Sequence, residues 1–140
     1  MTNSIFNYQS LNTDLASLLL RLIFGGLFMR YGYMKLASFN DILPMFGDPI
    51  GIGTKLSLIL VIFAELICGF LVAIGFLTRL TVIPIFITMT VVFFIVHAKD
   101  AFDAKTLPLV YWMLSMVIFV LGSGKFSVDR LLFNKRRRYA

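Results

Sequence analysis

Three charged side chains interrupt long apolar stretches of the sequence, and the chemistry available to the chain is concentrated in them. Arg21 and Arg30 lie in the first stretch, and Glu65 lies in the second. A charge near the centre of a lipid-crossing helix costs about 2.5–3.5 kcal/mol, so it needs a partner, water or a route to the membrane surface. Such residues bind a ligand headgroup, handle a proton, or clamp two helices together.

Helical periodicity separates the two arginines. At 100° per residue, one face of the first stretch carries two cations and two glycines: Arg21, Gly25, Gly32 and Lys35. Arg30 points to the opposite face and is close enough to the far membrane surface for its side chain to reach water. Arg21 is therefore the cation that must find a partner inside the protein.

We predict an ion pair between Arg21 and Glu65. At 1.5 Å per residue, Arg21 lies about 9 Å and Glu65 about 14 Å from the same end of two antiparallel spans. The axial difference of about 5 Å is within reach of an arginine side chain. Gly25 and Gly69 lie one turn from the charges and, together with Gly32, would let the helices approach closely. The pair would bind a ligand headgroup or tune a proton, or it would be a structural clamp, and the sequence supports both.

A single cysteine and a single histidine limit the redox chemistry that the chain can support alone. Cys68 cannot form an intrachain disulfide or a dithiol pair, and His97 cannot supply two axial ligands to a haem. We expect no metal or haem on this chain alone, so electron transfer would need a quinone or a partner. His97 would donate to a quinone carbonyl or relay a proton, or it is an ordinary interfacial residue. Four aromatic residues near the same membrane surface fit an aromatic belt, but their rings could also stack on a quinone: Tyr31, Tyr33, Tyr111 and Trp112.

These residues must be positioned by helices in a membrane. Of the 140 residues, 59% are hydrophobic and 14% are charged, whereas soluble domains are about 45–50% apolar and about 25% charged. This composition excludes an ordinary soluble enzyme, a disordered chain and a nucleic-acid-binding module. Four apolar stretches approach the roughly 20 residues of a lipid-crossing helix: residues 15–36, 54–74, 80–98 and 107–121. The fourth is the shortest, and its helix could begin nearer Asp103. We predict an all-α integral membrane four-helix bundle in which residues 1–140 form one domain.

Two further segments flank the predicted bundle. Residues 37–53 form a long, half-apolar outer loop between the first two helices, which would lie in the outer membrane interface or fold over the mouth of the bundle. Residues 122–140 form a tail, in which residues 127–133 are predicted to form a short amphipathic helix. A basic run follows that would contact anionic lipid headgroups rather than nucleic acid: Lys135, Arg136, Arg137 and Arg138.

Four spans place both termini on one side of the membrane. That side carries seven Lys and Arg residues against four on the other, and most of the excess lies in the tail. The positive-inside rule therefore predicts a multi-pass inner-membrane protein with both termini in the cytoplasm.

Three segments of the chain resemble the signatures of the DoxX family of small membrane proteins. They are residues 20–35, residues 64–79, and the Gly-rich Ser-x-Asp segment at residues 122–130. Their order and spacing match from about residue 14 to residue 132. The resemblance implies a four-helix membrane bundle with a redox association. Family members include the small subunit of a thiosulfate:quinone oxidoreductase and proteins described as quinol oxidase subunits.

The sequence thus supports two functions from different classes. In the first, the chain is a DoxX-like inner-membrane subunit of a quinone-linked redox system. A cavity organised by Arg21 and Glu65, open toward Lys35, His97 and the 37–53 loop, would bind a quinone or a similar small amphiphile. A redox partner would supply the electrons, and no catalytic residue is assigned on this chain. In the second, the chain is a non-catalytic scaffold that binds a lipid or another membrane protein. A homo-oligomer is compatible with both.

Overall fold

A computed structural model describes residues 10–137 of the chain. The regular elements within that range are all helical, which confirms the all-α prediction. In chain order they are α1 (Thr13–Ala37), α2 (Phe39–Ile42), α3 (Thr54–Ile62), η1 (Phe63–Cys68), α4 (Gly69–Ile74), α5 (Thr78–Val91), η2 (Val92–Val96), α6 (Phe102–Leu121) and α7 (Val128–Arg137). The π-helical segments η1 and η2 directly continue the α-helices that precede them.

Four helical runs are long and apolar enough to cross a membrane, as the sequence predicts. They are Thr13–Ala37, Thr54–Ile74, Thr78–Val96 and Phe102–Leu121. A helix of about 20 residues is about 30 Å long, which matches the hydrocarbon core of a bilayer. Their outward faces expose large apolar side chains, among them Ile23, Leu80 and Val120. An apolar surface of this extent is stable in lipid rather than in water, so we treat the chain as an integral membrane protein.

The fourth run begins at Phe102, five residues before the predicted start at residue 107. Its first turn is polar, and a hydropathy pattern marks only the apolar part of a helix. Asp103 lies in that first turn, where a negative charge interacts favourably with the helix dipole. The Thr106 hydroxyl donates to the Phe102 carbonyl oxygen over 3.1 Å. The helix therefore begins before the apolar segment does.

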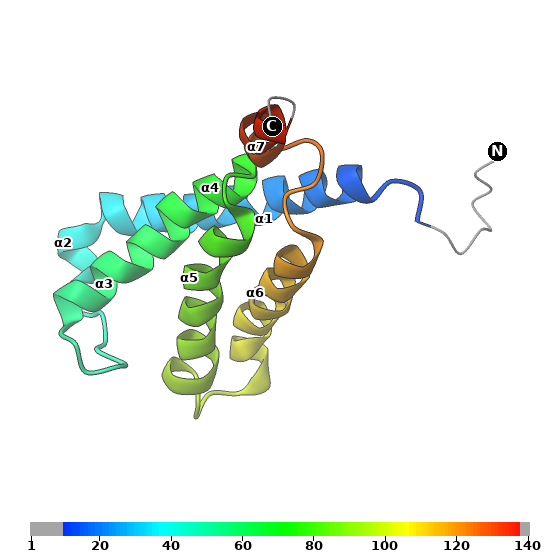
Figure 1. The fold of residues 1–140 in the computed structure, drawn as a ribbon. Helices are drawn as coiled ribbons and strands as arrows, with labels where there is room; N and C mark the ends of the chain where they lie inside the picture. The colour runs from blue at the N-terminus through cyan, green and yellow to red at the C-terminus, as the bar shows by residue number, and fades with distance from the viewer. Residues whose placement is uncertain (1–9, 138–140) are drawn as a thin grey trace.

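The four runs form two pairs that meet at one end of the molecule (Figure 1). In one pair, α1 packs along η1 and α4, and in the other, α5 packs along α6. The pairs converge where α7 lies across them and diverge toward their other ends. We call the end near α7 the tail side and the opposite end, which carries residues 38–53, the loop side.

Three glycines lie where α1 crosses the second run. A Cβ atom on Gly25 would lie 2.5 Å from the Gly69 carbonyl oxygen, and one on Gly32 would lie 2.6 Å from the Leu66 nitrogen. A Cβ on Gly69 would lie 3.0 Å from the Phe28 Cβ. These helices therefore touch backbone to backbone, as small residues permit in membrane proteins.

The 37–53 loop is fixed to the start of α3 by one carboxylate. Asp48 accepts hydrogen bonds from the Ile52 and Gly53 N–H groups, both at 2.9 Å, and from the Ser57 hydroxyl at 3.2 Å. The hydrogen bond from Gly53, followed by those from Ile52 and Ser57, lowers the pKa of Asp48 because each favours the ionised carboxylate. The loop thus has a defined shape over the loop side, where residues 45–49 border a cavity.

Candidate functional site

A cavity of about 640 Å³ opens on the loop side, where the two helix pairs diverge. Its walls come from α1, the second run, α5, η2, α6 and residues 45–49 of the loop. Most of the wall is apolar. The polar exceptions include three predicted site residues that the cavity brings together: Lys35, Glu65 and His97.

An ion pair between Lys35 and Glu65 forms the polar centre of this cavity. Lys35 Nζ donates to Glu65 Oε2 over 2.6 Å. The Glu65 side chain is 7% exposed, whereas the Lys35 side chain is 25% exposed. The Lys35 ammonium also lies 5.8 Å from the centre of the Tyr31 ring, within the range of a cation–π contact. The Glu65 carboxylate is therefore buried, and its partner, the Lys35 ammonium, is partly exposed.

The predicted Arg21–Glu65 ion pair is wrong, and Glu65 pairs with Lys35 instead. The prediction assumed that the two spans end at the same level, but Arg21 lies beside the carbonyl of Ala73 at the end of α4. Ala73 is eight residues, or about 12 Å, further along the helix than Glu65. Helical side chains lean toward their own N-terminus, so Lys35 and Glu65 on antiparallel helices lean toward each other.

Arg21 lies on the tail side, outside the cavity, and it is 1% exposed. Its guanidinium donates to the carbonyl oxygens of Ala73 at 3.2 Å and Phe126 at 2.6 Å, with a longer contact of 3.5 Å to Val72. The carbonyls at the end of a helix have no intrahelical partner and carry partial negative charge. Arg21 therefore satisfies the end of α4 and holds the tail against it. Arg21 is thus a structural clamp, but it binds backbone carbonyls and not Glu65, so it is not the clamp predicted from the sequence.

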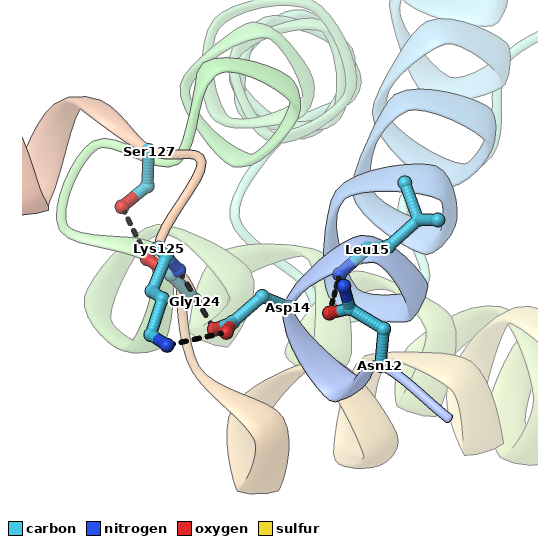
Figure 2. A network of polar contacts seen from close by, with 6 residues as sticks. All are labelled: Asn12, Asp14, Leu15, Gly124, Lys125 and Ser127. Atoms are coloured by element: carbon cyan, nitrogen blue, oxygen red, sulfur yellow. Dashed lines mark hydrogen bonds and ion pairs between the residues drawn. The ribbon is translucent and has the colours of Figure 1, made fainter. Parts of the chain in front are cut away.

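The tail is bound to the start of α1 by further polar contacts (Figure 2). Asp14 accepts from the Lys125 backbone N–H at 2.9 Å and lies 3.5 Å from its Nζ atom. Asn12 caps α1 by accepting from the Leu15 N–H at 3.0 Å, and the Ser127 hydroxyl donates to the Gly124 carbonyl at 2.7 Å. The tail is thus a packed element of the fold.

Asp129 lies in the first turn of α7, where a negative charge normally interacts with the dipole of its own helix. Its carboxylate instead accepts from the Leu77 N–H at 2.7 Å and the Thr78 N–H at 3.4 Å. It therefore caps the start of α5. Gly75, which has a φ of 75°, packs against the Arg21 guanidinium and the Ser127 side chain. No local sequence pattern reveals these contacts, because they join segments about 50 residues or more apart.

His97 ends η2 at the rim of the cavity. Its Nδ1 atom lies 2.6 Å from Asp100 Oδ2, so the carboxylate orients the ring. Deeper in the cavity, Tyr111 packs edge-on against Phe28 with ring centres 4.7 Å apart and faces Tyr31 at 6.5 Å. The cavity therefore has an aromatic wall, with the ion pair and the histidine among its polar groups.

Both π-helical segments contribute to this cavity. Glu65 lies within η1, and η2 supplies Val92, Ile95 and Val96 to the wall. Single π turns inside α-helices occur frequently at functional sites, because the extra residue redirects neighbouring side chains. The sequence gives no signal for either segment.

The predicted headgroup-binding residues lie at the end of the chain. Lys135, Arg136 and Arg137 form the last residues of α7, and Arg138 lies outside the described residues. Arg30 is exposed on the outer face of α1 and does not line the cavity.

Comparison with known proteins places the chain in a family. The family model for DoxX matches residues 16–98, which run from α1 to just beyond η2 and include Lys35, Glu65 and His97. An uncharacterized protein of Haemophilus influenzae is 32% identical over 73 residues, which cover 49% of this chain and 48% of that protein. The chain thus spans about half the length of this relative. No solved structure matches the chain. Because the family model covers more than half of its residues, the protein belongs to the DoxX family of membrane proteins.

Proposed function

We propose that the protein is the membrane subunit of a quinone-linked redox system, and that its loop-side cavity binds a quinone or a similar small amphiphile. The observation that carries this proposal is the Lys35–Glu65 ion pair, which lines a 640 Å³ cavity within the membrane-spanning part of the chain. An ion pair with a purely structural role is expected to be closely packed, whereas the Lys35–Glu65 pair borders the open space of the cavity.

The cavity fits such a ligand in size and in chemistry. Small-molecule sites are typically about 300–1,000 Å³, mostly apolar, with a few convergent polar groups. The aromatic wall of Phe28, Tyr31 and Tyr111 suits a planar ring. An ammonium has three N–H donors, so Lys35 can bind Glu65 and a ligand carbonyl oxygen at the same time.

The remaining polar groups supply a route for protons. A bound quinone would provide a couple that takes up two electrons and two protons. Glu65 can hold a proton beside the cavity, and Lys35 stabilises the carboxylate when the proton leaves. His97, hydrogen-bonded to Asp100 at the rim, can exchange protons with the solvent. The electrons would come from a partner protein.

The proposal also includes the orientation of the chain in the membrane. The tail side carries most of the Lys and Arg residues, so the positive-inside rule places it in the cytoplasm and the cavity at the outer face of the inner membrane. The redox partner and any homo-oligomer are part of this same proposal.

Equilibrium dialysis of the purified protein against a short-tailed quinone tests the proposal. The double variant Lys35→Gln/Glu65→Gln removes the pair without leaving a lone buried charge, and we expect about tenfold weaker binding. Arg30→Gln is the matched control, since it removes an exposed charge from the same helix, and it should bind as the wild type does. Unchanged binding in the folded double variant, or no saturable binding by the wild type, would overturn the proposal and favour a scaffold function.

A further inference from the structure

A second cavity, of about 650 Å³, lies on the tail side and is separate from the proposed quinone site. It is bordered by the start of α5, the connection between α6 and α7, and α7 itself. Two arginines line it, Arg79 from α5 and Arg130 from α7, and Asp129 is the carboxylate in its wall. Because Asp129 already accepts hydrogen bonds from the start of α5, the arginines are the charges available to a ligand.

The arginines are positioned by the ends of neighbouring helices. Arg79 Nε donates to the Phe119 carbonyl oxygen over 3.1 Å, which holds the guanidinium beside Gly122 at the end of α6. A guanidinium has five N–H donors, so this contact leaves donors for an anion. Arg130 lies in the first turn of α7, where its backbone N–H donates to the Ser127 hydroxyl over 3.3 Å.

A buried polar group in the same wall also lacks a partner. Thr78 is 1% exposed and lines the cavity, and its hydroxyl has no hydrogen-bond partner among residues 10–137. An unsatisfied buried hydroxyl costs about 1–3 kcal/mol. A water or ligand held in the cavity is one way to satisfy such a group.

Exposed apolar side chains also line the cavity. They are Leu80, Leu121 and Phe133, and Leu80 is 62% exposed. On α7, Leu131 and Leu132 are also exposed, as expected for a helix that lies in the membrane surface. A site in which two exposed arginines lie beside exposed apolar side chains matches the two parts of a phospholipid better than it matches a free anion.

We propose that this tail-side cavity binds the phosphate headgroup of an anionic phospholipid. Arg79 and Arg130 hold the phosphate through charge-assisted hydrogen bonds, and the acyl chains lie along Leu80 and Leu121. Basic pockets between transmembrane helices on the cytoplasmic side are suited to such headgroups. The bound lipid joins α5 to α7 and so holds the tail in place.

Native mass spectrometry of the protein in detergent micelles tests this site, because micelles of neutral detergent lack the charged surface of a vesicle. The wild type should retain one phosphatidylglycerol in preference to phosphatidylcholine. We expect Arg79→Gln/Arg130→Gln to lower that retention about tenfold. The control Lys55→Gln/Lys99→Gln removes the same charge on the loop side, and it should retain the lipid as the wild type does.

Three outcomes would overturn the proposal. The first is equal loss of lipid in the arginine and lysine double variants, and the second is equal retention of the two lipids by the wild type. The third is displacement of the lipid by millimolar inorganic phosphate, which would show a free-anion site. If the arginine variant does not fold, Ser123→Leu narrows the cavity without changing its charge, and it should lower lipid retention. Quinone binding should be unaffected in Ser123→Leu, so failure of this proposal is distinguishable from failure of the quinone proposal.

Discussion

The buried charges at the two ends of the molecule have different kinds of partner. On the tail side, Arg21 is 1% exposed and donates to backbone carbonyls of α4 and of the tail. On the loop side, Lys35 and Glu65 bind each other beside an open cavity. Both cations lie on α1, four turns apart on one face. A structural charge is therefore distinguished from a candidate site residue by its bonding partners and by the presence of a neighbouring cavity. Residue type and depth in the membrane do not make this distinction.

The largest predicted effect is at Arg21. Arg21→Gln leaves the carbonyls of Ala73 and Phe126 without their donor, and hydrogen bonds from charged donors contribute about 1.5–3 kcal/mol each. We expect the free energy of unfolding to fall by about 3 kcal/mol or more. Unfolding of the detergent-solubilised protein by a denaturing detergent measures it. A loss below about 1 kcal/mol would contradict the clamp.

The next effect compares two adjacent glycines of α1. Gly25→Ala places a methyl group 2.5 Å from the Gly69 carbonyl oxygen, whereas Gly26→Ala places one where nothing lies within 4 Å. We expect the first to destabilise by about 1–3 kcal/mol through overpacking. The second should be neutral or stabilise by up to about 1 kcal/mol, because alanine favours a helix. Equal shifts in the melting temperatures of the two variants would show that α1 and α4 do not pack as described.

A smaller effect is predicted for the loop-side pair. The double variant Lys35→Gln/Glu65→Gln removes both charges together, and the Lys35 side chain is already 25% exposed. We therefore expect a stability loss of about 1 kcal/mol or less. This loss should be smaller than that of Arg21→Gln in the same unfolding assay. A loss as large as that of Arg21→Gln would make the pair a second clamp.

The smallest effect concerns the loop over the cavity. The pKa of Asp48 is lowered, so its contribution to the folded loop is complete above the ordinary aspartate pKa of about 3.9 and is lost as the pH falls through the lowered value. Limited proteolysis within residues 38–53 should therefore accelerate only at strongly acidic pH, measured with an acid-stable protease. In the Asp48→Asn variant, the protease should cleave this loop quickly at every pH. Proteolysis of the wild type that does not change with pH would contradict the role of Asp48.

The fold follows from the sequence more readily than the site does. Apolar stretches of about 20 residues identify the four spans because lipid requires them, whatever the tertiary packing. The predicted Arg21–Glu65 pair failed because the axial offset between two helices is set by contacts such as Gly32 against Leu66. The tail contacts of Asp14 and Asp129 join distant segments, so no local pattern predicts them. The convergence of Lys35 and His97 on one cavity follows from their positions at the same ends of their spans.

The most direct test of the central claim is photoaffinity labelling with a short-tailed quinone that carries an azide, followed by mapping of the labelled residues. We expect labels on the cavity wall, in residues 28–35, 89–97 and 107–111, and competition by the unmodified quinone. At a quinone concentration below saturation, labelling should fall about tenfold in Lys35→Gln/Glu65→Gln and persist in Arg30→Gln. Labels spread over the lipid-facing surface, or confined to the tail side around Arg21, would contradict the assignment of the loop-side cavity as the binding site.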